Sequence, residues 1–291
     1  MEHFFQLAIM GVAMGSIYAL VALGVVLIFN AIQSLNFAQG EFLMLGAYFV
    51  LTVSGALKLP YVLEFFIMLG AMGVLGYFFE KIFCAPLRRA SYVTVLVSTL
   101  GMSIFFKNIA QFIWGPLPQF YDQPFGGSVL RMGNYSIPTQ YLFIIMVTLL
   151  LVLGLFVFLE RSSLGHMLKA ASEDQEAASL MGIRVERMIS LAFVVATILA
   201  GIGGILLAPI FFITLEMGYL VGLKAFAANI IGGFGSIPGA ILGGLVLGIT
   251  EMLGASYVSS TYKDVFAFAV LILVLCIRPQ GFLGEKVADK V

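Results

Sequence analysis

The sequence predicts an all-α membrane protein, a polytopic helical bundle of about eight spans with one or two broken or re-entrant helices. Two observations support this fold class. The chain is 61% hydrophobic and 10% charged, with a mean hydropathy of +1.08, whereas a soluble domain has roughly 25% charged residues. The apolar residues also gather into repeated runs near the length of about 20 residues that crosses a bilayer. Lipid must therefore replace water around most of the chain, which argues against a secreted enzyme, a nucleic-acid binder and a disordered protein.

The first apolar run, residues 4–29, is predicted to be a retained transmembrane helix. A cleaved signal peptide has a basic start and an apolar stretch of only about 7–15 residues, and this run has neither feature. The further runs cover residues 42–57, 61–79, 92–113, 141–159, 188–213, 219–234, 237–253 and 265–277. The shortest of them either continue into polar flanks or do not cross fully.

The distribution of Lys and Arg predicts the orientation, because these residues favour the cytoplasmic ends of spans. Residues 81–89, residues 160–187 and the tail from Arg278 are basic and should be cytoplasmic, whereas residues 115–140 contain only Arg131 and should be external. The N-terminus is then external if all three early runs cross.

Three apolar runs lie between the basic segment 160–187 and the tail. Either all three cross, or residues 219–253 dip into the membrane and return as a re-entrant hairpin. Both arrangements leave the tail inside.

Glycines four residues apart predict close helix packing. Such pairs lie on one helix face and let two backbones approach in lipid, and they occur at Gly11 and Gly15 and again at Gly244 and Gly248. We expect one transmembrane domain over residues 1–291, with residues 160–187 as a cytoplasmic loop.

The residues needed for common catalytic sites are missing. The sequence has no Gly-Lys pair and therefore no Walker A loop, and its two histidines, His3 and His166, form no zinc-protease spacing. The cysteines Cys84 and Cys276 form no metal cluster with them. We therefore expect no enzyme, cofactor or metal site, and many spans without a catalytic set indicate transport.

A short cytoplasmic helix of about nine residues is predicted to begin at Ser172. Ser172 and Gln175 fit a capping box, Glu173 and Asp174 would lie in the first turn, and Gly182 would end the helix.

This helix has an apolar side that no span would bury, formed by Ala177, Ala178, Leu180 and Met181. An exposed apolar patch rimmed by charge is typical of a partner site, and Glu176 would supply a charged contact at its edge. The alternative is a solvated linker helix.

A polar break separates the first two apolar runs. Asn36, Gln39 and Glu41 would have to face protein or water if they lie at membrane depth, and Gly40 would break the helix where the backbone lines a cavity. Two interpretations are equally open: these residues line the translocation path, or they form a structural polar cluster between helices.

A second break follows Asn229 and contains Gly232, Gly233 and Gly235. Interrupted apolar segments in both halves of a transporter point to its path, so these residues are also path candidates. A tight turn between two spans and a re-entrant hairpin remain alternatives. For the flanking Lys224 and Glu251 we favour interfacial positions with snorkelling side chains, with an intramembrane ion pair as the alternative.

The sequence Glu176-Ala177-Ala178-x-x-x-Gly182 resembles the loop of ABC importer permeases that forms the coupling helix and docks on the ATPase subunit. More of the chain is similar to one branch, the smaller of the two permeases of branched-chain amino acid ABC importers. The similar stretches are residues 34–48, 87–90, 98–101, 180–183, 200–204, 232–240 and 277–282. The family usually has histidine where this chain has Gln39, which puts a proton-sensitive role there in doubt.

The resemblance implies a permease subunit in the bacterial inner membrane that moves branched-chain or related amino acids into the cytoplasm. It implies two ABC ATPase subunits, a second related permease and an external substrate-binding protein. Residues 114–138 would contact this binding protein, while the alternative that we favour for most of these residues is a packed cover over the bundle. The resemblance does not tell whether the substrate is an amino acid, urea or a short amide. A self-sufficient secondary transporter or channel for a small polar solute is the alternative.

Overall fold

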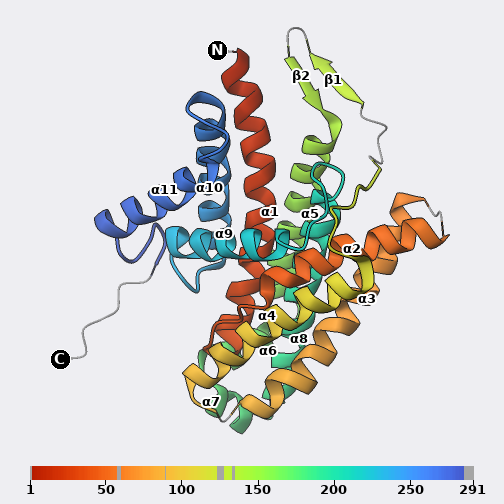
Figure 1. The fold of residues 1–291 in the computed structure, drawn as a ribbon. Helices are drawn as coiled ribbons and strands as arrows, with labels where there is room; N and C mark the ends of the chain where they lie inside the picture. The colour runs from red at the N-terminus through yellow and green to blue at the C-terminus, as the bar shows by residue number, and fades with distance from the viewer. Residues whose placement is uncertain (1, 58–59, 89, 123–127, 133–134, 285–291) are drawn as a thin grey trace.

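Helices make up most of the computed structural model, which describes residues 2–57, 60–88, 90–122, 128–132 and 135–284 (Figure 1). The helices are α1 (Glu2–Ile32), α2 (Gln39–Leu57), α3 (Tyr61–Phe79), α4 (Tyr92–Trp114), α5 (Thr139–Arg161), α6 (Ser163–Glu173), α7 (Gln175–Leu180), α8 (Val185–Leu207), α9 (Met217–Gly232), α10 (Ile237–Tyr257) and α11 (Lys263–Ile277). A π-helical turn, Glu80–Cys84, and a 3₁₀ turn, Ala85–Leu87, extend α3. The predicted all-α polytopic bundle is confirmed.

Each apolar run of the sequence lies in or overlaps a helix of the bundle. Seven helices of the described chain are long and apolar enough to cross a membrane. The helices α9 and α11 contain 16 and 15 residues, so they are about 24 and 22 Å long. Both are shorter than a hydrocarbon core of about 30 Å, in agreement with the expectation of some incomplete spans.

The central helix is α1, which packs against α8, α9 and α10. The predicted close approach through glycine is confirmed between α1 and α10. A Cβ added at Gly15 would lie 2.7 Å from the carbonyl oxygen of Gly244, and one at Gly11 would lie 2.8 Å from Cα of Ile249. The two backbones therefore touch, and a side chain at either glycine would force them apart.

One end of the bundle, which we call the hairpin end, carries the segment predicted to be external. Two short strands that the sequence did not predict, β1 (Val129–Met132) and β2 (Tyr135–Pro138), pair antiparallel there. The Gln6 side chain donates to the carbonyl oxygen of Ser136 at 2.8 Å, so the first turns of α1 also lie at this end (Figure 1).

The opposite end, which we call the basic end, gathers the three segments predicted to be cytoplasmic. Arg88 pairs with Glu186 at 3.6 Å, which joins the loop after α3 to the start of α8. The tail joins them because the Phe282 amide donates to the carbonyl oxygen of Ile231 at 2.9 Å, and Asn30 at the end of α1 donates to Gly235 at 3.1 Å. Arg89, Lys286 and Lys290 lie outside the described residues. The shared end agrees with the predicted topology, and the side of the membrane that it faces stays a prediction.

Beyond α8 the chain passes between the two ends three times, although α9 itself lies across α1 rather than along it (Figure 1). The segment before α9 reaches the hairpin end, where Ile213 forms a bridge with Gln119, and α9 finishes beside the tail. The helix α10 returns toward Gly15, in the half of α1 nearer the hairpin end, and α11 leads back to the tail. The structure thus agrees with three crossings rather than a re-entrant hairpin over residues 219–253.

Candidate translocation and coupling sites

The break between α1 and α2 lies at membrane depth. Three hydrogen bonds join α2, or the segment just before it, to α4 at a constant spacing of 62 residues: Phe37 with Thr99, Glu41 with Ser103 and Thr52 with Trp114. The two helices therefore run parallel. Thr99 lies seven residues into α4, about 10 Å from its basic end, so α2 begins inside the membrane.

The polar side chains of the break are buried, as the sequence predicted. Asn36, Gln39 and Glu41 are each at most 1% exposed. Gln39 donates to the carbonyl oxygen of Ala196 in α8 at 2.9 Å, and the Ser103 hydroxyl donates to Glu41 at 2.8 Å. The Asn36 side-chain oxygen accepts from the Ala38 amide at 3.1 Å and closes a turn just before α2.

Some polar atoms of this cluster have no protein partner. Within the described residues, Asn36 Nδ2, Gln39 Oε1 and Glu41 Oε2 make no hydrogen bond. A buried polar atom without a partner costs about 1–3 kcal/mol, and such atoms in native proteins call for water, an ion or a functional explanation. The assignment of these residues to the translocation path or to a structural polar cluster stays a prediction.

Gly40 lies where α2 crosses α9. A Cβ there would clash with the carbonyl oxygen of Gly218 and lie 2.8 Å from Cα of Gly222. Gly40 therefore permits backbone contact between the two helices, and it brings the start of α9 next to the polar break.

The coupling segment differs from the prediction at its N-terminal boundary. Ser172 and Glu173 belong to α6, and the Ser172 hydroxyl donates to the carbonyl oxygen of Leu168 instead of capping a new helix. Asp174 is the true cap: its backbone is extended, and its carboxylate accepts from the amides of Glu176 and Ala177 at 2.9 and 3.0 Å. The predicted capping box at Ser172 is wrong, because Asp174 competes for the same role two residues later.

The C-terminal boundary is as predicted. Gly182 has φ of +84°, its amide donates to Ser179 at 3.0 Å, and the Ile183 amide donates to Ala178 at 3.0 Å. This pair of bonds is the Schellman motif, which favours glycine at the left-handed position. The helix α7 is thus only six residues long but is fixed at both ends.

The exposed face of α7 is narrower than the sequence suggested. Leu180 and Met181 are 88% and 84% exposed, and Glu176 and Ala177 are exposed beside them. Ala178, however, is buried against the chain's own core. The prediction that Ala178 belongs to the exposed apolar side is therefore wrong, because this side chain packs into the chain's own core and attaches α7 to the bundle.

The second break is a turn at the basic end. Gly232 packs against the backbone of Gly239, and Gly233 packs against that of Gly284 in the tail. Asn229 is buried one turn earlier and donates to the carbonyl oxygen of Ala22 in α1 at 3.1 Å. Gly235 lines a cavity of about 750 Å³ between α1, α5 and α10. The turn is thus separate from the Asn36–Glu41 cluster, although both contact α1.

Comparison with known proteins identifies the family. Residues 7–275 match the family described as branched-chain amino acid transport system, permease component. The chain is 36% identical over 302 aligned residues to the high-affinity branched-chain amino acid transport system permease protein LivH of Escherichia coli K12, covering 99% of this chain and 98% of that one. The chain belongs to this family.

Two further relatives extend the similarity. BraD of Pseudomonas aeruginosa is 36% identical over the same coverage, and a probable LivH of Methanocaldococcus jannaschii is 30% identical over 92% of this chain and 89% of its own. The protein is therefore a permease subunit of an ABC importer and a multi-pass protein of the inner membrane.

A buried charge cluster surrounds Lys224 in this permease. Lys224 of α9 lies 2.7 Å from Glu251 of α10 and 2.7 Å from Asp264 of α11, and the Tyr18 hydroxyl of α1 donates to Glu251 at 2.8 Å. Lys224 and Glu251 are buried, so the interfacial, snorkelling interpretation is wrong and the ion-pair alternative is confirmed. The partners are too far apart in the sequence for spacing to have predicted them.

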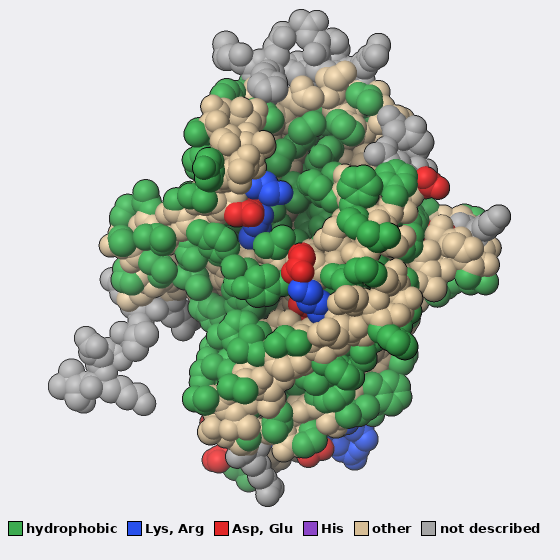
Figure 2. Space-filling model, viewed as in Figure 1, with side chains coloured by type: hydrophobic (Ala, Val, Ile, Leu, Met, Phe, Trp, Pro, Cys, Tyr) green, Lys and Arg blue, Asp and Glu red, His purple; other side chains and the backbone are tan. Residues whose placement is uncertain are grey.

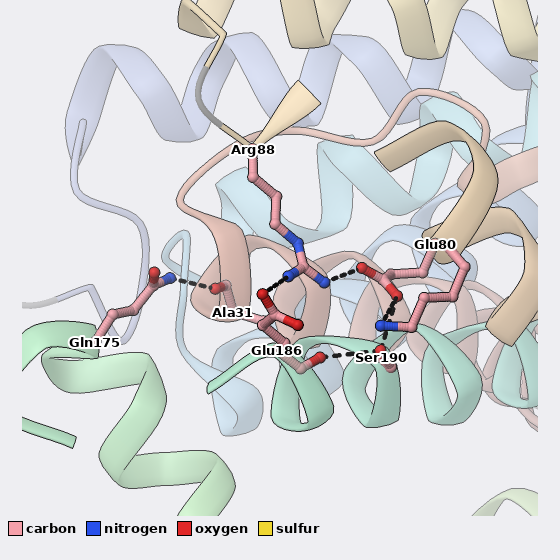
Figure 3. Close-up of polar contacts among 7 residues, drawn as sticks. Ala31, Glu80, Arg88, Gln175, Glu186 and Ser190 are labelled. Carbon is pink, nitrogen blue, oxygen red and sulfur yellow. Dashed lines mark hydrogen bonds and ion pairs between the residues drawn. The ribbon is translucent and has the colours of Figure 1, made fainter. Parts of the chain in front are cut away.

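A second cluster lies at the basic end (Figure 3). The fully buried Glu80 pairs with Arg88 and accepts from the Ser190 hydroxyl at 2.7 Å, while Arg88 also reaches Glu186. These contacts tie the π-helical turn after α3 to the first turns of α8. The basic residues of this segment, which the sequence used only for orientation, therefore also hold the fold together.

Proposed function

We propose that this permease moves branched-chain or related amino acids into the cytoplasm, driven by ATP hydrolysis on partner subunits. The observation that carries the proposal is similarity over nearly the whole length of relatives named for branched-chain amino acid transport. The proposed organisation is one permease domain over residues 1–291, with a cytoplasmic coupling loop over residues 160–187.

In this proposal the chain itself hydrolyses no ATP, and two ABC ATPase subunits bind α7. Support comes from Leu180 and Met181, two large apolar side chains that project from a helix held rigidly by Asp174 and Gly182. Apolar side chains exposed in water usually mark a contact surface. Glu176 would add a charged contact at its edge.

A second, related permease would complete the path, with an external binding protein delivering the solute at the hairpin end. Support comes from charges on the largely hydrophobic face in Figure 2, where the charged side chains gather in a few small groups. Lys107 of α4 pairs with Glu216 at 2.6 Å, and both are partly exposed. Lys107 lies seven residues before Trp114, so it is about 10 Å inside the membrane. Charges at this depth face protein or water rather than lipid.

The proposed path runs along the break that contains Asn36, Gln39, Gly40 and Glu41. The unpaired polar atoms of this cluster support it, since they could exchange hydrogen bonds with a passing polar solute. Asn229 would line another part of the path, on the side of α1 where it donates to the carbonyl oxygen of Ala22. Because Gly232, Gly233 and Gly235 lie at the basic end, their proposed part is to shape the inner end of the path.

The test is the ATPase activity of the purified complex, measured with binding protein that carries one ligand at a time. We expect leucine, isoleucine or valine to stimulate hydrolysis severalfold over the empty binding protein. Stimulation by urea or short amides alone would refute the amino acid assignment. A lack of any associated ATPase would favour the self-sufficient transporter or channel.

A further inference from the structure

Gln175, the first residue of α7, binds the end of α1. Its side-chain Nε2 donates to the carbonyl oxygen of Ala31 at 2.8 Å, across 144 residues of sequence (Figure 3). Ala31 lies in the last turn of α1, where carbonyl groups have no partner within the helix. The coupling segment thus caps the C-terminus of the central helix.

The chain turns sharply just after this contact. Among the described residues, Gln33 is the one non-glycine residue with a positive φ, +52°. A non-glycine residue held in this region stores conformational strain and depends on its surroundings to stay there. The residues that follow the turn are Asn36, Gln39 and Glu41, so the turn sets the position of the polar break.

A cavity beside the turn gives it room to move. The cavity has a volume of about 250 Å³, and its lining includes Gln33, Ser34, Cys84, Arg88 and Gln175. A well-packed neighbour would resist displacement, whereas an open space lets a segment shift without overpacking.

The opposite wall of this cavity is held in place. Arg88 is tied to Glu80 and Glu186, and Glu80 is tied to Ser190 (Figure 3). The ends of α3 and α8 are therefore cross-linked by charge-assisted bonds, which are stronger than neutral hydrogen bonds. A displacement of α7 would be carried to the more weakly held side, the turn at Gln33.

We propose that Gln175 is a positioning residue of the transport cycle: through its bond to Ala31 it transmits movement of α7 to the turn at Gln33 and to the polar break. This proposal rests on the proposed function, since it takes α7 as the contact for the ATPase. The side chain touches neither nucleotide nor solute.

The test compares three variants in the reconstituted complex of permease, ATPase and binding protein. Gln175→Met keeps the length of the side chain but cannot donate to Ala31. Gln175→Lys restores a donor, and a cation is favourable at a helix C-terminus. Gln111→Met makes the same chemical change on the exposed surface of α4 near the hairpin end and serves as the matched control.

For Gln175→Met we expect normal co-purification with the ATPase, basal hydrolysis close to that of the unaltered complex, and about a three- to tenfold loss of solute moved per ATP. Gln175→Lys should recover most of the solute moved per ATP, and Gln111→Met should leave this quantity unchanged. Unaltered coupling in Gln175→Met would overturn the proposal. So would loss of assembly in both Gln175 variants, because the residue would then be structural.

A second readout follows the cavity itself. Cys84 lines it, and the exposed Cys276 can be replaced by alanine. In the complex with Gln175 intact, nucleotide should change the rate at which a small maleimide modifies Cys84, and in Gln175→Met this dependence should disappear. The unaltered complex could transport solute while Cys84 is modified at the same rate with and without nucleotide. That result would refute the transmission through Gln175, while the proposed function would stand. If the unaltered complex transports nothing, the proposed function fails first.

Discussion

At the scale of single residues, glycine positions decide how closely the helices of the permease approach. Gly40→Ala should lower the thermal stability of the purified protein, because the added methyl group meets the backbone of Gly218 and Gly222, which cannot rotate away. Overpacking of this kind costs about 1–3 kcal/mol.

The matched control is Gly55→Ala in the same helix, where an added Cβ meets nothing within 4 Å. It should leave the melting temperature unchanged or raise it slightly, since alanine favours helix more than glycine does. Equal melting temperatures for the two variants, measured in one detergent, would show that α2 and α9 are not in close contact at Gly40.

The Lys224 cluster provides a second prediction at this scale. Lys224→Met should destabilise the permease by about 3–5 kcal/mol, because it leaves the buried Glu251 without its counter-ion. Combining it with Glu251→Met should recover most of the loss, since two apolar side chains of similar size replace the pair.

Thermal unfolding of the single and double variants measures both effects. A double variant no more stable than Lys224→Met would indicate that the cluster contributes through something other than the charge pair.

At the scale of elements, α7 is a short helix whose exposed side chains form the proposed contact with the ATPase. Leu180→Ser and Met181→Ser should each weaken binding of the ATPase about 10- to 100-fold, because an apolar side chain buried at an interface contributes about 1.5–3 kcal/mol. Both side chains are free of the chain's own core, so expression should be unaffected.

Val258→Ser, at an exposed apolar residue after α10, is the control for general loss of surface hydrophobicity. Affinity is measured by titrating the ATPase onto immobilised permease. Unchanged affinity in both α7 variants would show that this segment is only a linker. Substitution of the buried Ala178 would not answer the question, since it would disturb the permease itself.

At the scale of the whole molecule, the two ends of the bundle should face opposite sides of the membrane. Single cysteines at Ser128 and Ser179, both exposed, are placed in a chain with Cys84→Ala and Cys276→Ala. In intact cells an impermeant maleimide should modify Ser128→Cys, and Ser179→Cys should react only after the membrane is opened. The reverse pattern would overturn the orientation.

The architecture was largely predictable because it depends on properties that are local in the sequence. Apolar runs give helices in lipid, where every backbone group must be paired within the segment, and Gly182 ends α7 because that position needs a positive φ. The polar break at Asn36, Gln39 and Glu41 could be found for the same reason: three polar side chains in an apolar context must be buried together.

Contacts between distant segments could not be predicted from spacing. Lys224 and Glu251 lie on different helices, and the tertiary packing of α9 against α10, beside Tyr18 of α1, brings them together. The start of α7 was misplaced because Ser172 and Asp174 are both good caps, and only the extended backbone at Asp174 shows which one acts. The bond from Gln175 to Ala31 likewise depends on the tertiary fold.

Uptake of labelled leucine into proteoliposomes tests the central claim most directly, because it separates an ABC importer permease from a self-sufficient transporter. Three preparations are compared. The first is the permease alone. The other two contain permease, ATPase and binding protein, with ATP supplied on the ATPase side of the membrane in one and omitted in the other. We predict accumulation only in the complex with both ATP and leucine-loaded binding protein. Leucine transport by the permease alone, with or without an ion gradient, would contradict the account.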